Sequence, residues 1–342
     1  MSNIDVEVLG ALIAALGALM VSVVGFIATR ANQKTLATLE ADLATQAAER
    51  NARLEYEFEA RKRLYNECAP LLFELSEEAE RALGRIRGLA RTAAGGDLEP
   101  GPRSWLRRGY YRNSTYYRLL APLAIGKLLR HKLTRLDLSL DPAIHWQYAL
   151  CKQLGDTFTD DFRLASSPPV LRYDPHSDDA ETRRKTDTAI YWQQGVPRGI
   201  LDNAISGLLR EDPDGQRHLL TYGEFEAAVA NEESEVARHI KRVEYLLQDF
   251  HPGTRPVLWR VLLAQACLYR ALILAGDNLP PQPGLWNTIW EDDEIDSFSW
   301  LQRRADSGDA RNEMAVALTY CRTRTESVLH RLAVNPPPNT TL

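Results

Sequence analysis

The chain has 342 residues, of which 44% are hydrophobic and 25% are charged, and its formal net charge is −5. These values are ordinary for a globular protein and leave room for one large or two moderate domains. The four cysteines lie far apart without CxxC spacing, which argues against a zinc site and a redox pair and favours buried, reduced thiols. They are Cys68, Cys151, Cys267 and Cys321.

The N-terminal region contains an uncharged apolar run from Val8 to Ala28. A helix of this length spans about 30 Å, the thickness of the hydrocarbon core of a bilayer. A cleaved signal peptide is the less favoured alternative, because Asp5 and Glu7 precede the run and the apolar stretch is too long. The sequence predicts a single transmembrane helix within residues 1–29, with the lipid bilayer as its partner.

Positive charges flank this run only on its C-terminal side, at Arg30 and Lys34. The positive-inside rule therefore places the following chain in the cytoplasm and the N-terminus outside. Of the 41 basic residues, 34 are arginine and 7 are lysine, a ratio that suggests a GC-rich bacterial genome. We expect a single-pass protein of the bacterial inner membrane.

Small residues recur every fourth position within the run, at Gly10, Ala14, Ala18 and Ser22. Such a face allows two transmembrane helices to approach closely, which predicts a homo-oligomer. The alternative is that Gly and Ala are simply common in transmembrane helices.

Residues 30–94 are predicted to form a helical stalk, because neither Gly nor Pro occurs between Gly25 and Pro70 and helical periodicity continues to Ala90. An eleven-residue apolar repeat favours straight or slightly right-handed coiled-coil packing. This stripe either joins a parallel oligomer or packs against later helices of the same chain. Its positions are Leu36, Leu43, Ala47, Leu54, Phe58 and Tyr65.

Residues 95–334 are predicted to form a cytoplasmic α-helical domain, and the Pro-rich residues 335–342 a disordered tail. Strand patterns are nearly absent, so the predicted fold class is all-α. Five helices are expected, and the stretch 166–188 is expected to be a long surface loop. The helices lie at about 115–134, 141–164, 222–249, 256–275 and 310–333.

Two of these helices carry specific signals. Asp141 followed by Pro142 is typical of an N-cap and first helical position. The helix at 256–275 is apolar enough to resemble a second membrane span, but Arg260, Gln265 and Arg270 indicate a buried core helix.

The segment from Arg81 to Arg135 contains thirteen Lys or Arg residues against only Asp97 and Glu99. Aromatic residues lie between the charges, a mixture that can bind phosphates and stack bases, so nucleic acid, a nucleotide or anionic lipid headgroups are candidate ligands. The favoured interpretation is that these charges are solvated or paired within the fold, for instance with the acidic run at 291–296. The anion-binding candidates are Arg103, Arg107, Arg108, Arg112, Arg118, Lys127, Arg130 and Lys132.

No catalytic residue, metal site or cofactor is predicted, because HExxH, GxSxG and Walker A patterns do not occur. The stretch 212–226 resembles an EF-hand loop but has Thr221 where the last carboxylate is needed, so residues 212–215 are better interpreted as a turn. A carboxylate-rich loop is interpreted as solvated rather than metal-binding. Its residues are Asp174, His176, Asp178, Asp179 and Glu181.

The sequence leaves three classes of function open. The first is a membrane-anchored scaffold, adaptor or regulator that binds a cytoplasmic protein partner. The second is a membrane-tethered sensor or effector that binds nucleic acid, a nucleotide or another anion through the basic segment. The third is an enzyme of unrecognised type, which would show a deep pocket with convergent polar groups.

Overall fold

The computed structural model describes residues 3–133, 141–173, 193–276, 284–301 and 307–334. Helix accounts for 76% of the described structure and strand for 2%, which confirms the all-α prediction. The chain divides into two compact units, 1–60 and 61–342. The tail 335–342, the carboxylate-rich loop residues and most of the predicted 166–188 loop lie outside the described residues.

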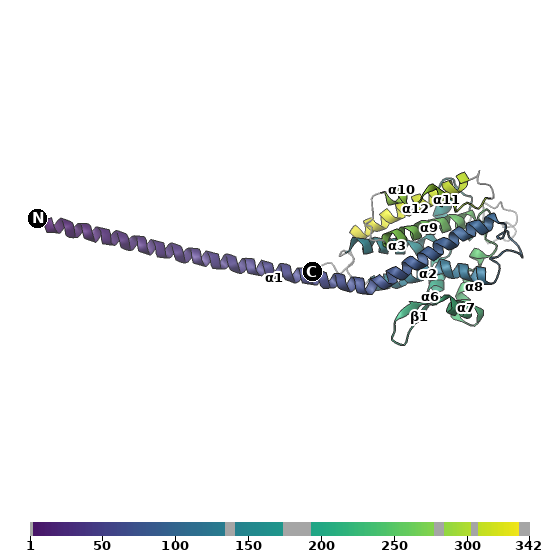
Figure 1. Cartoon of the computed structure of the whole chain (residues 1–342), viewed down its shortest axis with the longest axis horizontal. Helices are drawn as coiled ribbons and strands as arrows, with labels where there is room; N and C mark the ends of the chain where they lie inside the picture. Colours follow the sequence, from purple (N-terminus) through teal and green to yellow (C-terminus); the bar gives the residue numbers. More distant parts are fainter. Residues whose placement is uncertain (1–2, 134–140, 174–192, 277–283, 302–306, 335–342) are drawn as a thin grey trace. The chain divides into compact units, whose positions relative to one another are not determined.

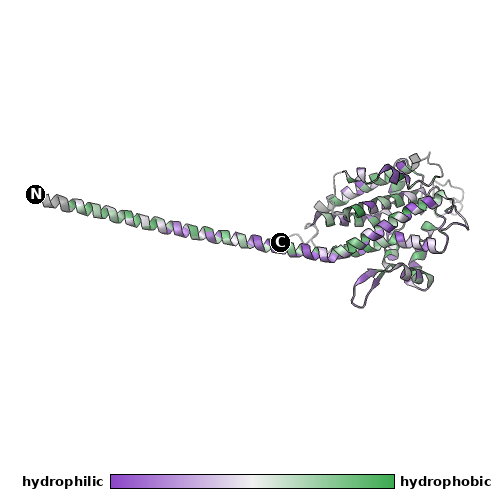
Figure 2. Cartoon of the chain, in the orientation of Figure 1, coloured by the Kyte–Doolittle hydropathy of each residue, from purple (hydrophilic) through white to green (hydrophobic). Residues whose placement is uncertain are grey.

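The first unit is the N-terminal part of helix α1 (Asn3–Ala94). Its side chains from Leu9 to Tyr56 are all exposed, including every large apolar side chain from Leu9 to Ile27. Figure 2 shows the resulting band of hydrophobic residues along this part of the helix. Within the first unit no other described element covers these side chains, so the helix alone leaves them exposed.

In the second unit, α1 continues from Arg61 as a core helix. Its buried apolar residues, from Leu64 to Ala93, follow helical periodicity and belong to the main hydrophobic core, with the partly buried Leu71 and Leu72 packed against it. The division between the two units falls at residue 60, within the predicted 30–94 stalk. Pro70 lies inside the helix without ending it.

Helix α9 (Pro256–Gly276) lies at the centre of the second unit and packs against α12 (Ser307–Val334), α3 (Pro142–Thr157) and α4 (Asp161–Ser166) (Figure 1). Trp259, Arg260 and Tyr269 on α9 are almost completely buried. By length and composition, α9 and the N-terminal part of α1 are the two described helices that could cross a membrane. The burial of α9 confirms the prediction of a core helix.

Most of the remaining elements lie on the side of α9 away from α12 (Figure 1). Helix α2 (Tyr110–Leu133) packs against α6 (Arg198–Gly207) and α7 (Tyr222–Ala230), and α6 packs against α8 (Glu235–Leu247). A short antiparallel hairpin pairs β1 (Leu209–Glu211) with β2 (Arg217–Leu219) in the register Leu209 to Leu219. Two short helices, α10 (Leu285–Thr288) and α11 (Asp292–Asp296), precede α12.

Local capping explains where the helices begin. The Asp141 carboxylate accepts hydrogen bonds from the backbone N–H groups of Ala143 and Ile144, which confirms the predicted N-cap. The single helix expected at 222–249 is instead two helices, because the chain is extended at Asn231 and Ser234 caps α8 by accepting from Ala237. Similarly, the helix expected at 141–164 ends at Thr157 and α4 begins at Asp161.

Candidate anion-binding site

The eight predicted anion-binding residues divide by their surroundings. Arg103, Arg107 and Arg108 lie in the connection between α1 and α2, where their side chains are exposed. Among the described residues, no carboxylate lies within ion-pair distance of these three. They are solvated charges.

Three others are paired with carboxylates from distant parts of the sequence. The closest N–O distances are 2.6 Å for Arg112 with Glu244, 3.0 Å for Arg118 with Glu78, and 2.9 Å for Lys132 with Glu67. Glu78 is only 5% exposed, so its charge is compensated chiefly by its arginine neighbours. Much of the formal positive excess of the basic segment is therefore neutralised within the fold.

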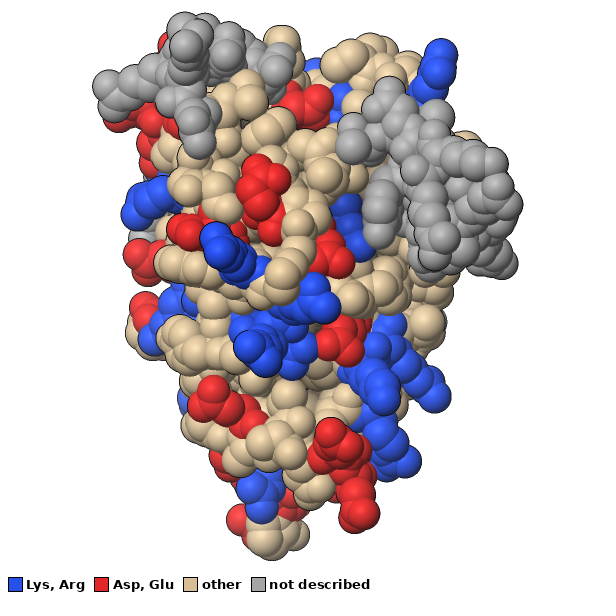
Figure 3. Space-filling model, turned by 90° about the vertical axis from the view of Figure 1, so that its right-hand side faces the viewer, with Lys and Arg blue, Asp and Glu red and all other residues tan. Residues whose placement is uncertain are grey.

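Lys127 and Arg130 lie further along α2. Lys127 donates to the Ser206 hydroxyl at 2.8 Å. The Arg130 Nε is buried and has no hydrogen-bond partner among the described residues. The eight residues consequently do not converge on one site. On the face shown in Figure 3, Lys and Arg side chains gather in groups with Asp and Glu between them.

The acidic run at 291–296 does contribute to internal pairing. Glu294 accepts from Arg87 at 3.4 Å and from Arg270 at 3.3 Å. Arg87 belongs to the basic segment, so the expected pairing between the two regions occurs at this residue.

Two tyrosines of the basic segment are buried and hydrogen-bonded within the core. The Tyr116 hydroxyl donates to the Glu244 carbonyl at 2.8 Å, and the Tyr117 hydroxyl donates to the Leu220 carbonyl at 2.7 Å. Burial raises the pKa of Tyr117 to about 12. Because these two rings form part of the core, they present no face on which a base can stack.

Arginines do converge in a groove between α1 and α2, which we call the arginine groove. It has a volume of about 420 Å³. Antiparallel packing of the two helices is shown by the contacts of Arg118 with Glu78, Arg85 with Ser114 and Thr92 with Tyr111. The groove is lined by Arg81, Gly84, Arg85, Gly88, Arg91, Thr92, Tyr111 and Arg118.

The four arginines of the groove differ in their partners. Arg81 pairs with Glu77 and Glu78 on its own helix, and Arg118 shares Glu78. Arg85 donates to the Ser114 hydroxyl at 3.0 Å, and its guanidinium lies 4.7 Å from the centre of the Tyr111 ring. Arg91 is exposed.

Two glycines open the floor of the groove. A Cβ added at Gly84 or Gly88 would meet no heavy atom within 4 Å, so the space above both positions is empty. The hydroxyls of Thr92 and Tyr111 lie 2.8 Å apart, and the Thr92 hydroxyl donates to the Gly88 carbonyl at 2.7 Å. The groove therefore combines cationic walls, hydroxyl groups and room for a ligand.

Sequence reasoning missed most of this groove. Only Arg118 was among the predicted residues, although a signal was present: positions 81, 84, 85, 88, 91 and 92 share one helical face and carry only Arg, Gly and Thr. A helix face without apolar residues is normally solvent-exposed, so its meeting with α2 could not be anticipated without the helical hairpin.

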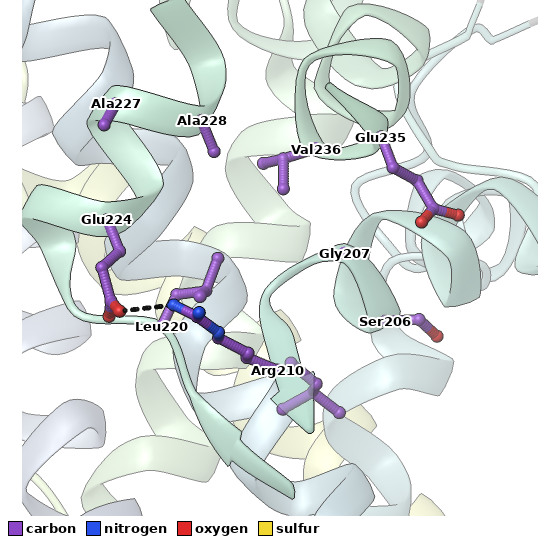
Figure 4. A pocket seen from close by; sticks show the side chains of 10 residues that line it. Ser206, Gly207, Arg210, Leu220, Glu224, Ala227, Ala228, Glu235 and Val236 are labelled. Atoms are coloured by element: carbon purple, nitrogen blue, oxygen red, sulfur yellow. Dashed lines mark hydrogen bonds and ion pairs between the residues drawn. The ribbon is translucent and has the colours of Figure 1, made fainter. Parts of the chain in front are cut away.

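A second hollow lies between α6, the hairpin and the helices α7 and α8, with a volume of about 430 Å³ (Figure 4). Its principal charges compensate one another, since Arg210 pairs with Glu224 at 3.2 Å. Glu235 lies on the opposite side of the hollow and Val236 contributes an apolar wall. This mixed lining favours no class of ligand.

Within the described ranges, no group of three or more His, Cys, Asp or Glu side chains could hold a metal ion. The residues 212–215 form the turn of the β1–β2 hairpin, with Gly215 at a φ of 75°, which confirms the prediction of a turn.

No protein-family model matches the chain, and comparisons with curated proteins and with solved structures find no match. The function is therefore inferred from the residues and the geometry of this chain alone.

Proposed function

We propose that this chain is a membrane-anchored helical protein whose C-terminal domain faces the cytoplasm and serves as a scaffold, adaptor or regulator. The observation that supports this proposal is the uncharged run from Val8 to Ala28, whose large apolar side chains from Leu9 onward are 48–73% exposed. A membrane is the environment that would bury them on all sides of the helix.

The magnitude of the hydrophobic effect supports an anchor. Fully burying a Val, Leu, Ile, Met or Phe side chain contributes about 1.5–3 kcal/mol. Eleven such residues between Leu9 and Ile27 are exposed in the first unit. Leaving all of them in water would cost more than a typical folding free energy of about 5–15 kcal/mol.

The charges around the run support a cytoplasmic domain. Arg30 and Lys34 follow it directly, and retention of positive charge in the cytoplasm would keep everything after them on that side. Four free, buried cysteines are consistent with a reducing compartment. A cytoplasmic protein partner and a homo-oligomer complete the proposal.

Alkaline carbonate extraction tests the anchor. We expect the full-length chain to remain in the membrane pellet, whereas a variant with Leu16→Arg and Leu19→Arg is released, since each arginine near the bilayer centre costs about 2.5–3.5 kcal/mol. Leu36→Arg with Leu39→Arg is the matched control, because these exposed leucines have the same spacing beyond the run. Release of the full-length chain under the same conditions would refute the anchor.

A second function is favoured by the arginine groove: a membrane-tethered sensor or effector of an anionic ligand. The groove is lined by four arginines and by no acidic side chain. It supplies the converging positive charge that the eight sequence-predicted residues do not.

A further inference from the structure

The arginine groove has the features of a binding site for a small phosphate-bearing molecule. We propose that it binds an oligophosphate anion, of the class of inorganic pyrophosphate or a nucleoside di- or triphosphate. This inference deepens the sensor function and does not depend on the membrane anchor.

The uncompensated positive charge of the groove favours an anionic ligand. Arg85 and Arg91 have no carboxylate within ion-pair distance among the described residues, whereas Glu78 compensates part of the charge of Arg81 and Arg118. A phosphate entering the groove therefore meets at least two guanidinium groups without displacing an existing ion pair. Guanidinium–phosphate hydrogen bonds are charge-assisted and can be bidentate, which makes them roughly twice as strong as neutral ones.

The spacing of the arginines in the groove favours a ligand with more than one phosphate. Arg85 and Arg91 are six positions apart on α1, so their backbone positions differ by about 9 Å along the helix axis. Arg118 reaches the groove from α2 on the opposite wall. Because the exposed Arg91 side chain can turn towards Arg85 from this position, the arrangement suits a ligand with two or more linked phosphates better than a single phosphate.

The empty space over the two glycines of the groove can accommodate a small molecule. The glycines at positions 84 and 88 leave the helix surface bare, so a ligand can approach the α1 backbone closely. The volume of about 420 Å³ lies in the lower part of the range for small-molecule sites, about 300–1,000 Å³. This size favours a small molecule over a nucleic-acid strand, which requires an extended channel.

The Arg85 side chain is already ordered by its neighbours within the fold. Its guanidinium is held between the Ser114 hydroxyl and the face of the Tyr111 ring, and the Tyr111 hydroxyl is in turn bonded to Thr92. Trp105 contacts the same ring edge-on at 5.4 Å. A side chain already ordered loses less conformational entropy when a ligand binds.

Isothermal titration calorimetry of the full-length chain in nonionic detergent, at low salt, tests the proposal with pyrophosphate and ATP as probes. We expect both to bind the native chain, and Arg85→Ala with Arg91→Ala to weaken binding at least about tenfold. The control, Arg107→Ala with Arg108→Ala, removes the same charge outside the groove and should bind within about twofold of the native chain.

A variant that fills the groove separates its shape from its charge. Gly88→Met adds a side chain where space is empty and removes no charge. We expect it to lose binding while its melting temperature is maintained or raised, since replacing a helical glycine favours the helix. Retention of native affinity in this folded variant would contradict a ligand lying in the groove.

Three further outcomes would overturn the proposal. The first is no binding of pyrophosphate or ATP by the native chain at low salt. The second is equal loss of binding in the groove and control variants, which would indicate general surface charge. The third is groove-dependent binding to an oligonucleotide or to anionic lipid vesicles but not to the small probes. Carbonate extraction reports on the anchor separately, so the two proposals can fail independently.

Discussion

Arg260 is a completely buried cation that the fold satisfies in full. Its guanidinium pairs with both carboxylate oxygens of Glu313, at 2.5 and 2.9 Å, and donates to three backbone carbonyls. One carbonyl belongs to Leu164 in the last turn of α4, and the other two belong to Ser167 and Pro169, which follow this helix. Arg260 thus joins α9, α12 and the chain after α4 in one polar network.

Removing this side chain should be among the most damaging single changes in the domain. Arg260→Ala leaves the Glu313 charge and the carbonyls without a partner, so we expect a loss of about 3–5 kcal/mol in the free energy of unfolding. Arg311→Ala, which breaks an exposed pair with Asp296, should cost under about 1 kcal/mol. Urea denaturation followed by circular dichroism measures both, and similar losses in the two variants would contradict this assignment.

The four cysteines should be unreactive in the native protein. Burial raises the pKa of Cys68 to about 11 and that of Cys151 to about 12, and Cys267 and Cys321 are also completely buried. A thiol whose pKa is raised stays protonated, and only the thiolate is nucleophilic. At pH 8 we expect almost no reaction with Ellman's reagent until denaturant is added, when all four react. Rapid labelling of the folded chain would disagree with this packing.

At the scale of elements, the C-terminal part of α1 and the turn after it contain two kinds of glycine. Gly84 lies within the helix facing empty space, whereas Gly96 has a φ of +83° just beyond it. The N–H of Asp97 donates to the Thr92 carbonyl and that of Gly96 to the Ala93 carbonyl, the pattern of a Schellman C-cap.

The two glycines should therefore respond to alanine in opposite directions. Gly84→Ala should stabilise the protein by about 0.5–1 kcal/mol, because alanine loses less backbone entropy in a helix. Gly96→Ala should destabilise it, because alanine is strained at positive φ. Thermal melts of both variants check the signs, and stabilisation by Gly96→Ala would contradict the cap.

Elements with strong local signals were predictable from the sequence. The N-cap at Asp141 needs only a side-chain acceptor before a proline, and α9 needs only a long apolar run interrupted by polar residues that can be satisfied inside a core. The β1–β2 hairpin was missed because strands of three residues are too short to show alternation. The break between α7 and α8 depends on a cap at Ser234 that an apolar periodicity does not reveal.

The arginine groove was not predictable as a site for a different reason. Its arginines can be read from the sequence, but whether each one is available to an anion depends on which carboxylates lie near it in the folded chain. Arg112 and Arg118 are equally basic in the sequence, yet both are paired with glutamates from elsewhere in the chain, whereas Arg85 and Arg91 lack such partners among the described residues. Only the packing of α1 against α2 makes this distinction.

At the scale of the whole molecule, the proposed oligomer makes a testable demand on the proposed transmembrane face formed by Gly10, Ala14, Ala18 and Ser22. Replacing Ala14 and Ala18 by leucine should separate the helices and weaken association about tenfold, because close backbone approach depends on small side chains. Val23→Leu, on the opposite side of the helix, should leave association unchanged. Energy transfer between labelled chains in lipid vesicles measures this, and no difference between the variants would place any interface elsewhere.

The most direct test of the membrane-anchored account is the sidedness of single introduced cysteines. The native cysteines are all buried, so the unmodified chain provides a low background. A membrane-impermeant maleimide is applied to intact spheroplasts that express Ser2→Cys or Arg107→Cys, the latter at an exposed position. We predict labelling of Ser2→Cys in intact spheroplasts and of Arg107→Cys only after lysis. Labelling of Arg107→Cys before lysis, or protection of both positions until lysis, would contradict a single span with a cytoplasmic domain.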